Sequence, residues 1–453
     1  MKTTAKTKNV REVAIDLLVQ IEKNQAYSNL LLHQAIKQHQ VSSKDTGLLT
    51  EMVYGTLQRK LTLDFYIEPY LKKQNKLEDW VKILLRITVY QMKYLDRVPD
   101  RAAIFEAVEI AKRKGHKGIG SMVNGVLRSL QRTGFRSFDE VQDPIERLAI
   151  EMSFPSWLIS RWVKQYGLEE TKELCQETLL PPISSARINT AVTTAEEVMK
   201  SMEEAGVSTR TGNLSDDALI IERGNFANTA AYQDGLLTIQ DESSMLVGRA
   251  LGPEKDDMIL DSCAAPGGKS THIAELLRNT GKVISVDLHE HKIKLINEQV
   301  NRLHLTNVET KVMDSRKLTE VYKSETFDRI LVDAPCSGLG VIRRKPDIKY
   351  QKNESDIHSL AGIQSTILDA IAPLLKKGGT LVYSTCTMDK EENDEVVIKF
   401  LESHPDFERD SMLVERLPEK IRGNAEHNGA QIQILPHHFG TDGFFISSLR
   451  KQV

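Results

Sequence analysis

Residues 258–277 read MILDSCAAPGGKSTHIAELL, and they decide the fold of the C-terminal half of the chain. A short apolar run leads into a glycine-rich turn and then into a helical pattern, which is typical of a strand joined to a helix by a ligand-binding turn. Further apolar runs follow at 283–287 (VISVD), 329–335 (RILVDAP) and 380–386 (TLVYSTC), each after a helical stretch. This alternation predicts βαβ units and a parallel sheet, in which ligands bind beyond the carboxyl ends of the strands.

The glycine-rich turn fits two kinds of ligand. Gly268, Lys269 and Ser270 match the end of the P-loop pattern GxxxxGK[ST], but Cys263 stands where its first glycine belongs. A P-loop NTPase is therefore disfavoured, although this turn alone does not exclude it. The other ligand is a nucleoside cofactor, held close to the backbone N–H groups of a helix N-terminus.

Acidic residues close the next two strands. Asp287 ends VISVD, at a position where a carboxylate can accept hydrogen bonds from the ribose hydroxyls of a nucleoside. Asp314, in KVMDSRKL, closes the third strand and can face an adenine edge. A lone Asp more often caps a helix or a turn, but regular placement at successive strand ends favours a nucleoside site. Because no GxGxxG pattern is present, S-adenosylmethionine (SAM) fits better than a dinucleotide.

Two of the four cysteines also lie at strand ends. Cys336 follows Asp333 in DAPCSG, and Cys386 ends YSTC. Carbon 5 of a pyrimidine becomes nucleophilic only after a thiolate adds at C6, so a thiol beside a SAM pocket favours methylation of carbon over that of an exocyclic amine. A free thiol is only a few per cent ionised at pH 7, and Lys269 is the candidate cation that favours the thiolate.

The composition is that of an ordinary globular protein with several domains. The 453 residues correspond to about three domains, and 40% hydrophobic with 27% charged residues excludes wholesale disorder. The four dispersed cysteines form neither a disulfide framework nor a zinc pattern, so we expect a reduced, cytoplasmic protein without a bound metal. Cys175 and Cys263 are interpreted as buried structural thiols. No apolar run suffices for a membrane span and no signal core is present, so neither export nor a membrane partner is expected.

The N-terminal third is predicted to be a bundle of helices. Apolar stripes at helical spacing begin at Val10 and recur as far as Leu130, which indicates an all-α domain over residues 9–135. The formal net charge of the chain is −3, but residues 1–140 hold 24 basic and 15 acidic side chains, or +9, which leaves −12 for residues 141–453. The basic helical third is therefore the candidate nucleic-acid interface.

One stretch of this region, residues 111–136, concentrates the positive charge. It contains no acidic side chain and seven basic ones: Lys112, Arg113, Lys114, Lys117, Arg128, Arg132 and Arg136. A charge run is commonly a solvated helix face, but the absence of a compensating acid favours contact with RNA or DNA. Arg343, Arg344 and Lys345, after the DAPCSG loop, are further candidate phosphate contacts, with a solvated turn as an equal alternative.

Four motifs give the C-terminal half a specific resemblance. The stretches DSCAAPGGKS, DAPCSGLGVIRRKPD, YSTCTMDKEENDEVV and LPHHFGTDGFF resemble the RNA cytosine-C5 methyltransferase family (NOL1/NOP2/Sun). Upstream, AIFEAVEIAKRKG and SMVNGVLRSL resemble the helical RNA-binding domain of the antitermination factor NusB. A NusB-like domain in front of such a methyltransferase is similar to the bacterial members of the family that act on 16S rRNA, and the resemblance covers essentially the whole chain.

The resemblance implies a role for each residue at the strand ends. Cys386 corresponds to the nucleophile of the RNA family, and Cys336 to the cysteine that assists product release. Asp333, beside both thiols, is expected to contact the N3 and N4 edge of the cytosine, and IQDESS at 239–244 to line the methionine end of SAM. The SAM site is expected to comprise Cys263, Ala264, Ala265, Pro266, Gly267, Gly268, Lys269, Asp287, Asp314 and Asp333.

We therefore expect three parts: a NusB-like helical RNA-binding domain at 1–140, a small α/β RNA-binding linking module at 141–235, and a Rossmann-like SAM-dependent methyltransferase domain at 236–453. The expected reaction is methylation of carbon 5 of a cytosine in naked or partly assembled 16S rRNA, through a covalent Cys–C6 adduct, by a monomer. Two alternatives stay open beside the NTPase. One is a tRNA methyltransferase of the same family, and the other is an assembly or antitermination factor with a vestigial catalytic domain.

Overall fold

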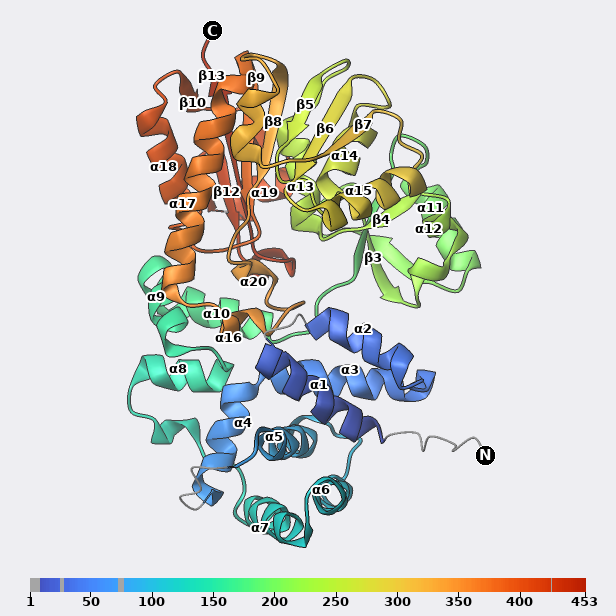
Figure 1. The fold of residues 1–453 in the computed structure, drawn as a ribbon, viewed down its shortest axis with the longest axis vertical. Coiled ribbons are helices and arrows are strands. Elements are labelled where there is room, and N and C mark those ends of the chain that lie inside the picture. Colours follow the sequence, from blue (N-terminus) through green and yellow to red (C-terminus); the bar gives the residue numbers. More distant parts are fainter. Residues whose placement is uncertain (1–8, 25–27, 72–76, 425) are drawn as a thin grey trace. The chain divides into compact units, whose positions relative to one another are not determined.

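The computed structural model describes residues 9–24, 28–71, 77–424 and 426–453 (Figure 1). The chain forms two compact units. The helical unit comprises Met1–Leu179 together with Arg344–Gln351, and the α/β unit comprises Leu180–Arg343 together with Lys352–Val453. In the described ranges no helix is long and apolar enough to span a membrane.

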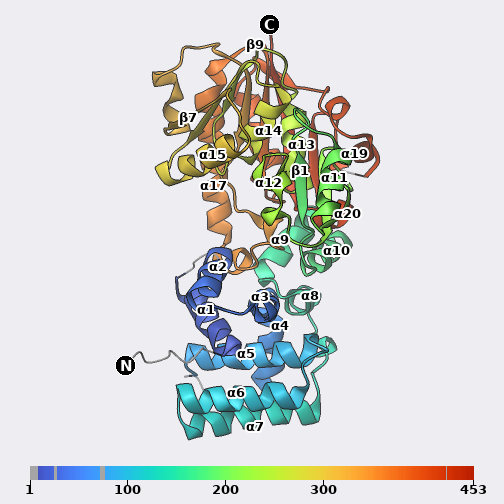
Figure 2. The same cartoon turned by 90° about the vertical axis from the view of Figure 1, so that its right-hand side faces the viewer.

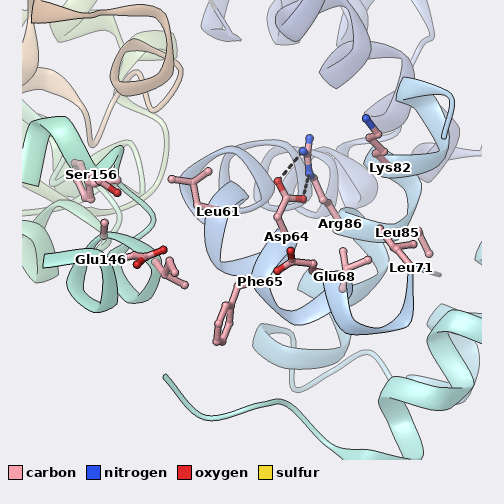
Figure 3. A pocket seen from close by; sticks show the side chains of 14 residues that line it. Leu61, Asp64, Phe65, Glu68, Leu71, Lys82, Leu85, Arg86, Glu146 and Ser156 are labelled. Atoms are coloured by element: carbon pink, nitrogen blue, oxygen red, sulfur yellow. Dashed lines mark hydrogen bonds and ion pairs between the residues drawn. The ribbon is translucent and has the colours of Figure 1, made fainter. Parts of the chain in front are cut away.

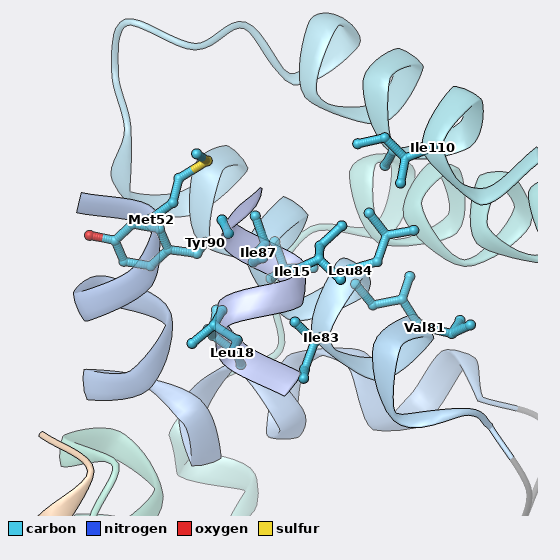
Figure 4. Packing of buried hydrophobic residues seen from close by; sticks show 14 of the residues in the cluster. Ile15, Leu18, Met52, Val81, Ile83, Leu84, Ile87, Tyr90 and Ile110 are labelled. Carbon is cyan, nitrogen blue, oxygen red and sulfur yellow. The ribbon is translucent and has the colours of Figure 1, made fainter. Parts of the chain in front are cut away.

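The helical unit is built from amphipathic helices. They are α1 (Val10–Asn24), α2 (Ser28–Gln38), α3 (Ser43–Gln58), α4 (Lys60–Ile67), α5 (Asp79–Tyr94), α6 (Asp100–Lys114), α7 (Lys117–Thr133), α8 (Pro144–Met152), α9 (Ser156–Tyr166), α10 (Leu168–Thr178) and α16 (Ile348–Gln351), with 3-10 turns η1 (Glu68–Tyr70) and η2 (Phe138–Glu140). The predicted apolar stripe of α1 is buried, and its Ile15 and Leu18 belong to one core with Met52 of α3 and Leu84 of α5 (Figure 4). The prediction of an all-α N-terminal domain is confirmed.

Helix α16 packs inside the helical unit although it follows the DAPCSG loop in sequence. The fully buried Lys349 donates from Nζ to the carbonyl oxygen of Gln58 at 2.8 Å, and its Nζ lies 4.1 Å from the centroid of the Phe154 ring. The Tyr350 hydroxyl lies 2.9 Å from Ser153 Oγ. Burial lowers the pKa of Lys349 well below its ordinary value. These contacts fix α16 to the helical unit.

The α/β unit begins with a small antiparallel sheet. Its elements are β1 (Ser185–Ile188), α11 (Ala195–Glu204), β2 (Ser208–Thr211), β3 (Ala218–Arg223), η3 (Phe226–Asn228), α12 (Ala230–Gln233) and β4 (Leu237–Ile239). The strand order is β2-β3-β1-β4, and every pair is antiparallel. Val198 and Met202 of α11 share a core with Ala186 and Leu219 of the sheet. Strand β1 lies in the stretch SSARINT at 184–190, and the α/β character predicted for the linking module is confirmed.

The rest of the unit is a Rossmann-like fold. Its helices are α13 (Glu242–Leu251), α14 (Gly268–Leu276), α15 (Glu290–Arg302), α17 (Glu354–Ile371), α18 (Asp394–Ser403), α19 (Glu419–Asn424) and α20 (Pro436–Phe439), and its 3-10 turns are η4 (Ser315–Glu320), η5 (Leu339–Val341), η6 (Ala372–Leu374) and η7 (Val414–Arg416). Its strands are β5 (Met258–Asp261), β6 (Lys282–Asp287), β7 (Val308–Val312), β8 (Phe327–Asp333), β9 (Leu375–Thr385), β10 (Phe407–Arg409), β11 (Glu426–His427), β12 (Gln431–Ile434) and β13 (Phe444–Lys451).

These strands form one sheet in the order β11-β12-β13-β9-β8-β5-β6-β7, with β10 paired to β13. Strands β9, β8, β5, β6 and β7 are parallel, as predicted, whereas β10 to β13 add an antiparallel edge that the sequence did not indicate. One face of the sheet packs on α17 and α18 and the other on α13 and α14 (Figures 1 and 2). Helices therefore cover both faces of the sheet. A ligand is expected to bind at the carboxyl ends of the parallel strands.

Candidate active site

The parallel strands bring the predicted residues to one edge of the sheet. Asp261 ends β5, Asp287 ends β6 and Asp333 ends β8, while Cys386 directly follows β9. Because β5 lies between β6 and β8, and β9 is the next strand along, these four ends are neighbours in space. The expected nucleoside site and the expected thiol centre therefore share one edge.

The glycine-rich turn leads directly into α14. Gly267 has φ +104°, a conformation that a residue with a Cβ rarely adopts, and it is the N-cap of the helix. A Cβ on Gly267 would also lie 3.2 Å from the Cα of Ile296 on α15. The turn is held by hydrogen bonds from Ala264 N to Val286 O at 2.9 Å and from Gly267 N to Ala264 O at 2.8 Å. It presents the first N–H groups of a helix, which suit an anionic group such as the carboxylate of a bound SAM.

Asp261 is a buried acid that sequence reasoning did not single out. Its Oδ2 accepts a hydrogen bond from Ser270 Oγ at 2.6 Å, and its Oδ1 has no partner among the described residues. Burial raises the pKa of Asp261 to about 7. An orphaned buried oxygen beside the turn fits a cofactor that donates a hydrogen bond there. The signal available in the sequence was the acid directly before the glycine-rich turn.

The two other expected cofactor acids differ in their surroundings. Asp287 is nearly buried, with its Oδ1 accepting from the N–H of His289 at 3.2 Å and lying 3.6 Å from Lys292 Nζ. Asp314 is the N-cap of η4 and forms a 2.6 Å ion pair with Arg316. The hydrogen bond from Arg316 lowers the pKa of Asp314. Asp314 therefore has the capping role that a lone Asp commonly has, and its contact with adenine stays a prediction.

The two strand-end cysteines lie against each other. The Sγ atoms of Cys336 and Cys386 are 3.4 Å apart, and both residues are partly buried. The hydrogen bond with Cys386 raises the pKa of Cys336 well above its ordinary value, and burial and the nearby Glu392 act in the same direction. Cys336 is therefore held as a neutral thiol that can donate to sulfur on Cys386. The two remaining cysteines also have raised pKa values through burial, Cys263 to about 12 and Cys175 beyond that.

Lys269 and Asp333 form the ion pair of the site. Lys269 Nζ lies 2.7 Å from Asp333 Oδ2, and Ser384 Oγ donates to Asp333 Oδ1 at 2.9 Å. Burial opposes a charge on Lys269, but Asp333 and Cys386 outweigh it, so its pKa is raised overall. Its Nζ also lies 5.0 Å from the centroid of the Phe444 ring. Lys269 is thus a persistent cation beside Asp333, and its charge also interacts with Cys386.

A buried glutamate that the sequence analysis missed holds the Cys336 loop. Glu392 accepts from the N–H of Ser337 at 2.8 Å and from Gln364 Nε2 at 3.0 Å, and Ser337 Oγ also donates to it. Gln364 Nε2 contacts the carbonyl oxygen of Pro335 at 2.9 Å as well. Burial raises the pKa of Glu392. The only signal was its place in the motif YSTCTMDKEENDEVV.

Two glycine-containing segments meet the strand-end segment of Cys386. Gly340 N donates to Cys386 O at 2.9 Å, and Gly443 N donates to Gly340 O at 2.9 Å. A Cβ on Gly340 would lie 2.0 Å from the Gly443 carbonyl oxygen, so no side chain fits there. This close approach explains in physical terms why the DAPCSGLG, YSTC and TDGFF stretches occur together in one site.

A buried arginine links the small antiparallel module to the cofactor turn. Arg187 of β1 donates to both carboxylate oxygens of Glu275 on α14, at 2.9 and 2.8 Å, and to the carbonyl oxygen of Gly268 at 2.8 Å. It also donates to Gln240, which stands in IQDESS, and whose side chain lies beside Gly268. Sequence reasoning missed Arg187, because its partner Glu275 is 88 residues away along the chain.

Two predictions about phosphate contacts need correction. Arg343 is only 6% exposed and donates to the carbonyl oxygens of Gly440 at 2.8 Å and Pro181 at 2.9 Å, so it supports loops rather than a phosphate. The basic run of α6 does have compensating acids, which come from elsewhere in the fold. The pairs are Lys112–Glu109 at 2.7 Å, Arg113–Glu12 at 3.1 Å and Lys114–Asp16 at 2.8 Å.

Known proteins match the chain along its length. Family models match the NusB family at residues 8–132, the ferredoxin-like domain of RsmF/B-like methyltransferases at 154–226, and the 16S rRNA methyltransferase RsmB/F at 248–450. The chain is 55% identical to probable ribosomal RNA small subunit methyltransferase B of Bacillus subtilis over 447 residues, 99% of this chain and 100% of the relative. It is 34% identical to the protein of the same description from Synechocystis sp., over 98% of this chain and 99% of the relative.

Solved structures share the fold. PH0851 has a TM-score of 0.81 at 27% identity and covers 100% of both chains. NSun6 from Pyrococcus horikoshii, solved with SFG, has a TM-score of 0.59 and covers 66% of this chain and 99% of its own. At 24% identity this second likeness shows the fold alone.

A Rossmann-like sheet with a glycine-rich turn, acids at its strand ends and an attached NusB-like bundle defines a SAM-dependent RNA methyltransferase. The chain belongs to the family of ribosomal RNA small subunit methyltransferase B. The predicted resemblance, the fold class and the SAM cofactor are thereby confirmed.

Proposed function

We propose that this chain methylates carbon 5 of a cytosine in 16S rRNA through a covalent adduct between Cys386 and C6 of the base. The observation that carries the proposal is the pair of thiols 3.4 Å apart at the ends of β8 and β9, beside the Lys269–Asp333 ion pair. Methylation of an amine or a hydroxyl requires no thiol, whereas activation of a pyrimidine C5 requires a nucleophile at C6.

The first step is addition of the Cys386 thiolate to C6. The S–C6 bond forms, and the electron pair of the C5–C6 double bond moves to C5 in conjugation with N3. Lys269 stabilises the thiolate before attack, because its positive charge interacts with the sulfur of Cys386. Asp333 accepts a hydrogen bond from the cytosine amino group on a remaining lone pair, which orients the ring and favours a proton at N3.

When bound, SAM supplies the methyl group that C5 receives. Breakdown of the adduct then requires loss of the C5 proton to a base and departure of the Cys386 sulfur, which restores the C5–C6 double bond. Cys336 is the neighbour that assists this departure, since its neutral thiol donates to the leaving sulfur. The high pKa of Cys336 supports its role as a proton carrier and that of Cys386 as the nucleophile.

The proposed substrate is 16S rRNA, which the names of the family model and of the relatives support, and we propose that it reacts when naked or partly assembled. A cytosine in a helix must be flipped out before a thiol can reach C6, which costs a few kcal/mol. Unpaired or incompletely assembled RNA should therefore react faster than a finished subunit. The chain is proposed to act as a monomer in the cytoplasm and without a metal.

The test is to incubate the protein with methyl-labelled SAM and either unmethylated 16S rRNA or unmethylated tRNA, and to map the modified nucleotide by nuclease digestion and mass spectrometry. Label in 5-methylcytosine at one position is the expected result. Label in an exocyclic amine or a ribose hydroxyl would refute the C5 chemistry, and label only in tRNA under the same conditions would refute the substrate.

A further inference from the structure

The helical unit carries a hollow of about 550 Å³ between α6 and α7 that has no part in the site described above. On α6 it is lined by Arg101, Phe105 and Lys112, which lie at i, i+4 and i+11 and so share one face of the helix. Asn124 and Arg128 of α7, at i and i+4, line it from the other side. The hollow therefore combines an aromatic ring, an amide, three cations and one carboxylate, Glu109.

Phe105 is exposed without a structural reason in its own helix. It is 62% exposed, whereas its neighbours Ile104 and Ala107 are buried in the core of the unit. The apolar face of α6 is thus complete without Phe105, and the ring stands in the hollow with its surface available. Exposed aromatic rings flanked by cations are the usual platform for unstacked bases of single-stranded nucleic acid.

The polar groups around the ring have spare hydrogen-bonding capacity. In the described part of the chain Arg101 and Asn124 have no side-chain hydrogen bond or ion pair. Arg128 donates to Gln131 Oε1 at 2.8 Å, a neutral partner that leaves the guanidinium charge uncompensated. Lys112 is paired with Glu109, so two of the three cations are available for phosphates.

Another hollow of the same unit provides a contrast. It lies beside α4 and α5, has a volume of about 530 Å³ and contains the Arg86–Asp64 ion pair, with Nε to Oδ1 at 2.6 Å (Figure 3). Together with Glu68 and Glu146, which also line it, that hollow has three carboxylates, whereas the α6–α7 hollow has one, Glu109, which is paired with Lys112. Charge complementarity with RNA therefore favours the α6–α7 hollow.

We propose that the α6–α7 hollow holds an unstacked base of a single-stranded RNA segment, with the base on the Phe105 ring, the Asn124 amide at the base edge, and Arg101 and Arg128 at the flanking phosphates. The inference rests on the RNA substrate of the proposed function, and it adds a second point of contact outside the thiol centre. It concerns RNA binding alone and needs no methyl transfer.

Fluorescence of a tryptophan placed at the site tests stacking directly. Phe105→Trp should retain binding of a single-stranded fragment of 16S rRNA, and its emission should be quenched when the RNA binds, because the indole stacks on a base. Leu30→Trp is the matched control, since Leu30 is 59% exposed on α2 of the same unit. Equal quenching of both variants, or of neither, would overturn the proposal.

Affinity gives the second readout. Phe105→Ala should weaken the Kd for the single-stranded fragment ~5- to 100-fold, with little effect on a duplex of the same length and no change in the salt dependence. Arg101→Gln and Arg128→Gln should each lower the slope of log Kd against log salt by ~0.7, whereas Lys44→Gln on α3 should not. Unchanged RNA affinity of Phe105→Ala would overturn the proposal. A Phe105→Ala variant that loses binding of a ribosomal protein but still binds RNA normally would also overturn it. If the unmodified chain bound the RNA fragment as expected but did not methylate C5 of cytosine, this result would count only against the proposed C5 chemistry and not against the α6–α7 hollow.

Discussion

The Arg187–Glu275 pair of the α/β unit and the Arg113–Glu12 pair at α6 differ in burial, and thereby in what they can do. Arg187 and Glu275 have side chains that are 0% and 2% exposed, whereas Arg113 and Glu12 are 51% and 20% exposed. Breaking one side of a buried pair costs about 3–5 kcal/mol, while an exposed pair is worth about 0–1 kcal/mol. The buried charges therefore hold groups in place for chemistry, and the exposed ones can exchange a carboxylate for a phosphate at little cost.

The thiol centre gives the largest expected effect. Cys386→Ala should lower methylation by more than ~1,000-fold and abolish the covalent complex, because the nucleophile is lost. Cys336→Ala should instead let an enzyme–RNA adduct accumulate, which a denaturing gel with labelled RNA measures. Cys175→Ala, in the helical unit, is the control that should retain turnover. An adduct that persists in Cys386→Ala and disappears in Cys336→Ala would exchange the two roles.

The buried ion pair gives the second effect. Arg187→Gln leaves Glu275 buried without a counter-charge and should lower the free energy of unfolding by about 3–5 kcal/mol, measured with urea. Arg187→Lys keeps the charge but not the bidentate geometry, and should recover only part of the loss. The Kd for SAM should rise in the same order, since Arg187 also holds the Gly268 carbonyl.

Arg113→Gln is the matched exposed variant, and it should change the free energy of unfolding by no more than about 1 kcal/mol. Equal losses in Arg187→Gln and Arg113→Gln would remove the distinction between the two regions. A fall in stability with an unchanged Kd for SAM would reduce Arg187 to a structural link without a positioning role.

The pH dependence of stability gives the third effect. Because burial raises the pKa of Asp261 to about 7, against ~3.9 in the unfolded chain, the folded chain holds a proton between these values that the unfolded chain has lost. The free energy of unfolding should therefore fall as the pH rises from ~4 to ~7, by up to ~1.4 kcal/mol per pH unit from this group. Asp261→Asn should remove this contribution to the slope in urea titrations.

Asp314→Asn is the control for this slope. The Arg316 hydrogen bond lowers the pKa of Asp314, so its contribution is present above its ordinary pKa and is lost only as the pH falls through the lower folded value. The slope between pH ~4 and ~7 should therefore stay as in the unmodified chain. Because burial also raises the pKa of Glu392, part of the slope should remain in Asp261→Asn. A slope that is unchanged in Asp261→Asn would assign the titrating proton to another buried group.

The sequence predicted those features that are local. Each strand-end residue, from Asp287 to Cys386, follows its own apolar run, so spacing alone brought them to one edge of the sheet. Glu392 and Arg187 were not predictable in this way, because their roles depend on partners that only the fold brings near. The antiparallel strands β10 to β13 were missed for a related reason. They join the sheet because β13 pairs with β9, and they do not follow the alternation of strand and helix that predicted the parallel strands.

The basic run at residues 111–136 also depends on partners that are distant along the chain, which the sequence analysis could not identify. Residues 111–136 contain no acid, and yet Arg113 and Lys114 meet carboxylates of α1, which lie 101 and 98 positions away. A short stretch of sequence therefore shows its own charges, but it does not show which distant acids pair with them in the fold. RNA contact is therefore still predicted only for cations whose ion pairs can be broken at a small cost in free energy.

The smallest expected effect on stability comes from Lys112, Arg113 and Lys114 changed together to Gln. Their pairs are exposed, so each should contribute less than about 1 kcal/mol to the free energy of unfolding. RNA affinity should fall, and the slope of log Kd against log salt should flatten by less than the ~0.7 per contact of free cations, because RNA must first displace Glu12 and Asp16. Filter binding of 16S rRNA across salt concentrations measures both quantities.

The converse change separates compensation from contact. Glu12→Gln and Asp16→Asn together should free Arg113 and Lys114, and so tighten RNA binding and steepen its salt dependence, if α6 touches RNA. A solvated helix face would show neither change, and both sets of variants would then bind RNA as the unmodified chain does. If the two sets of variants shifted RNA affinity in opposite directions, the acids of α1 would be shown to limit the binding of RNA to the basic side chains of α6.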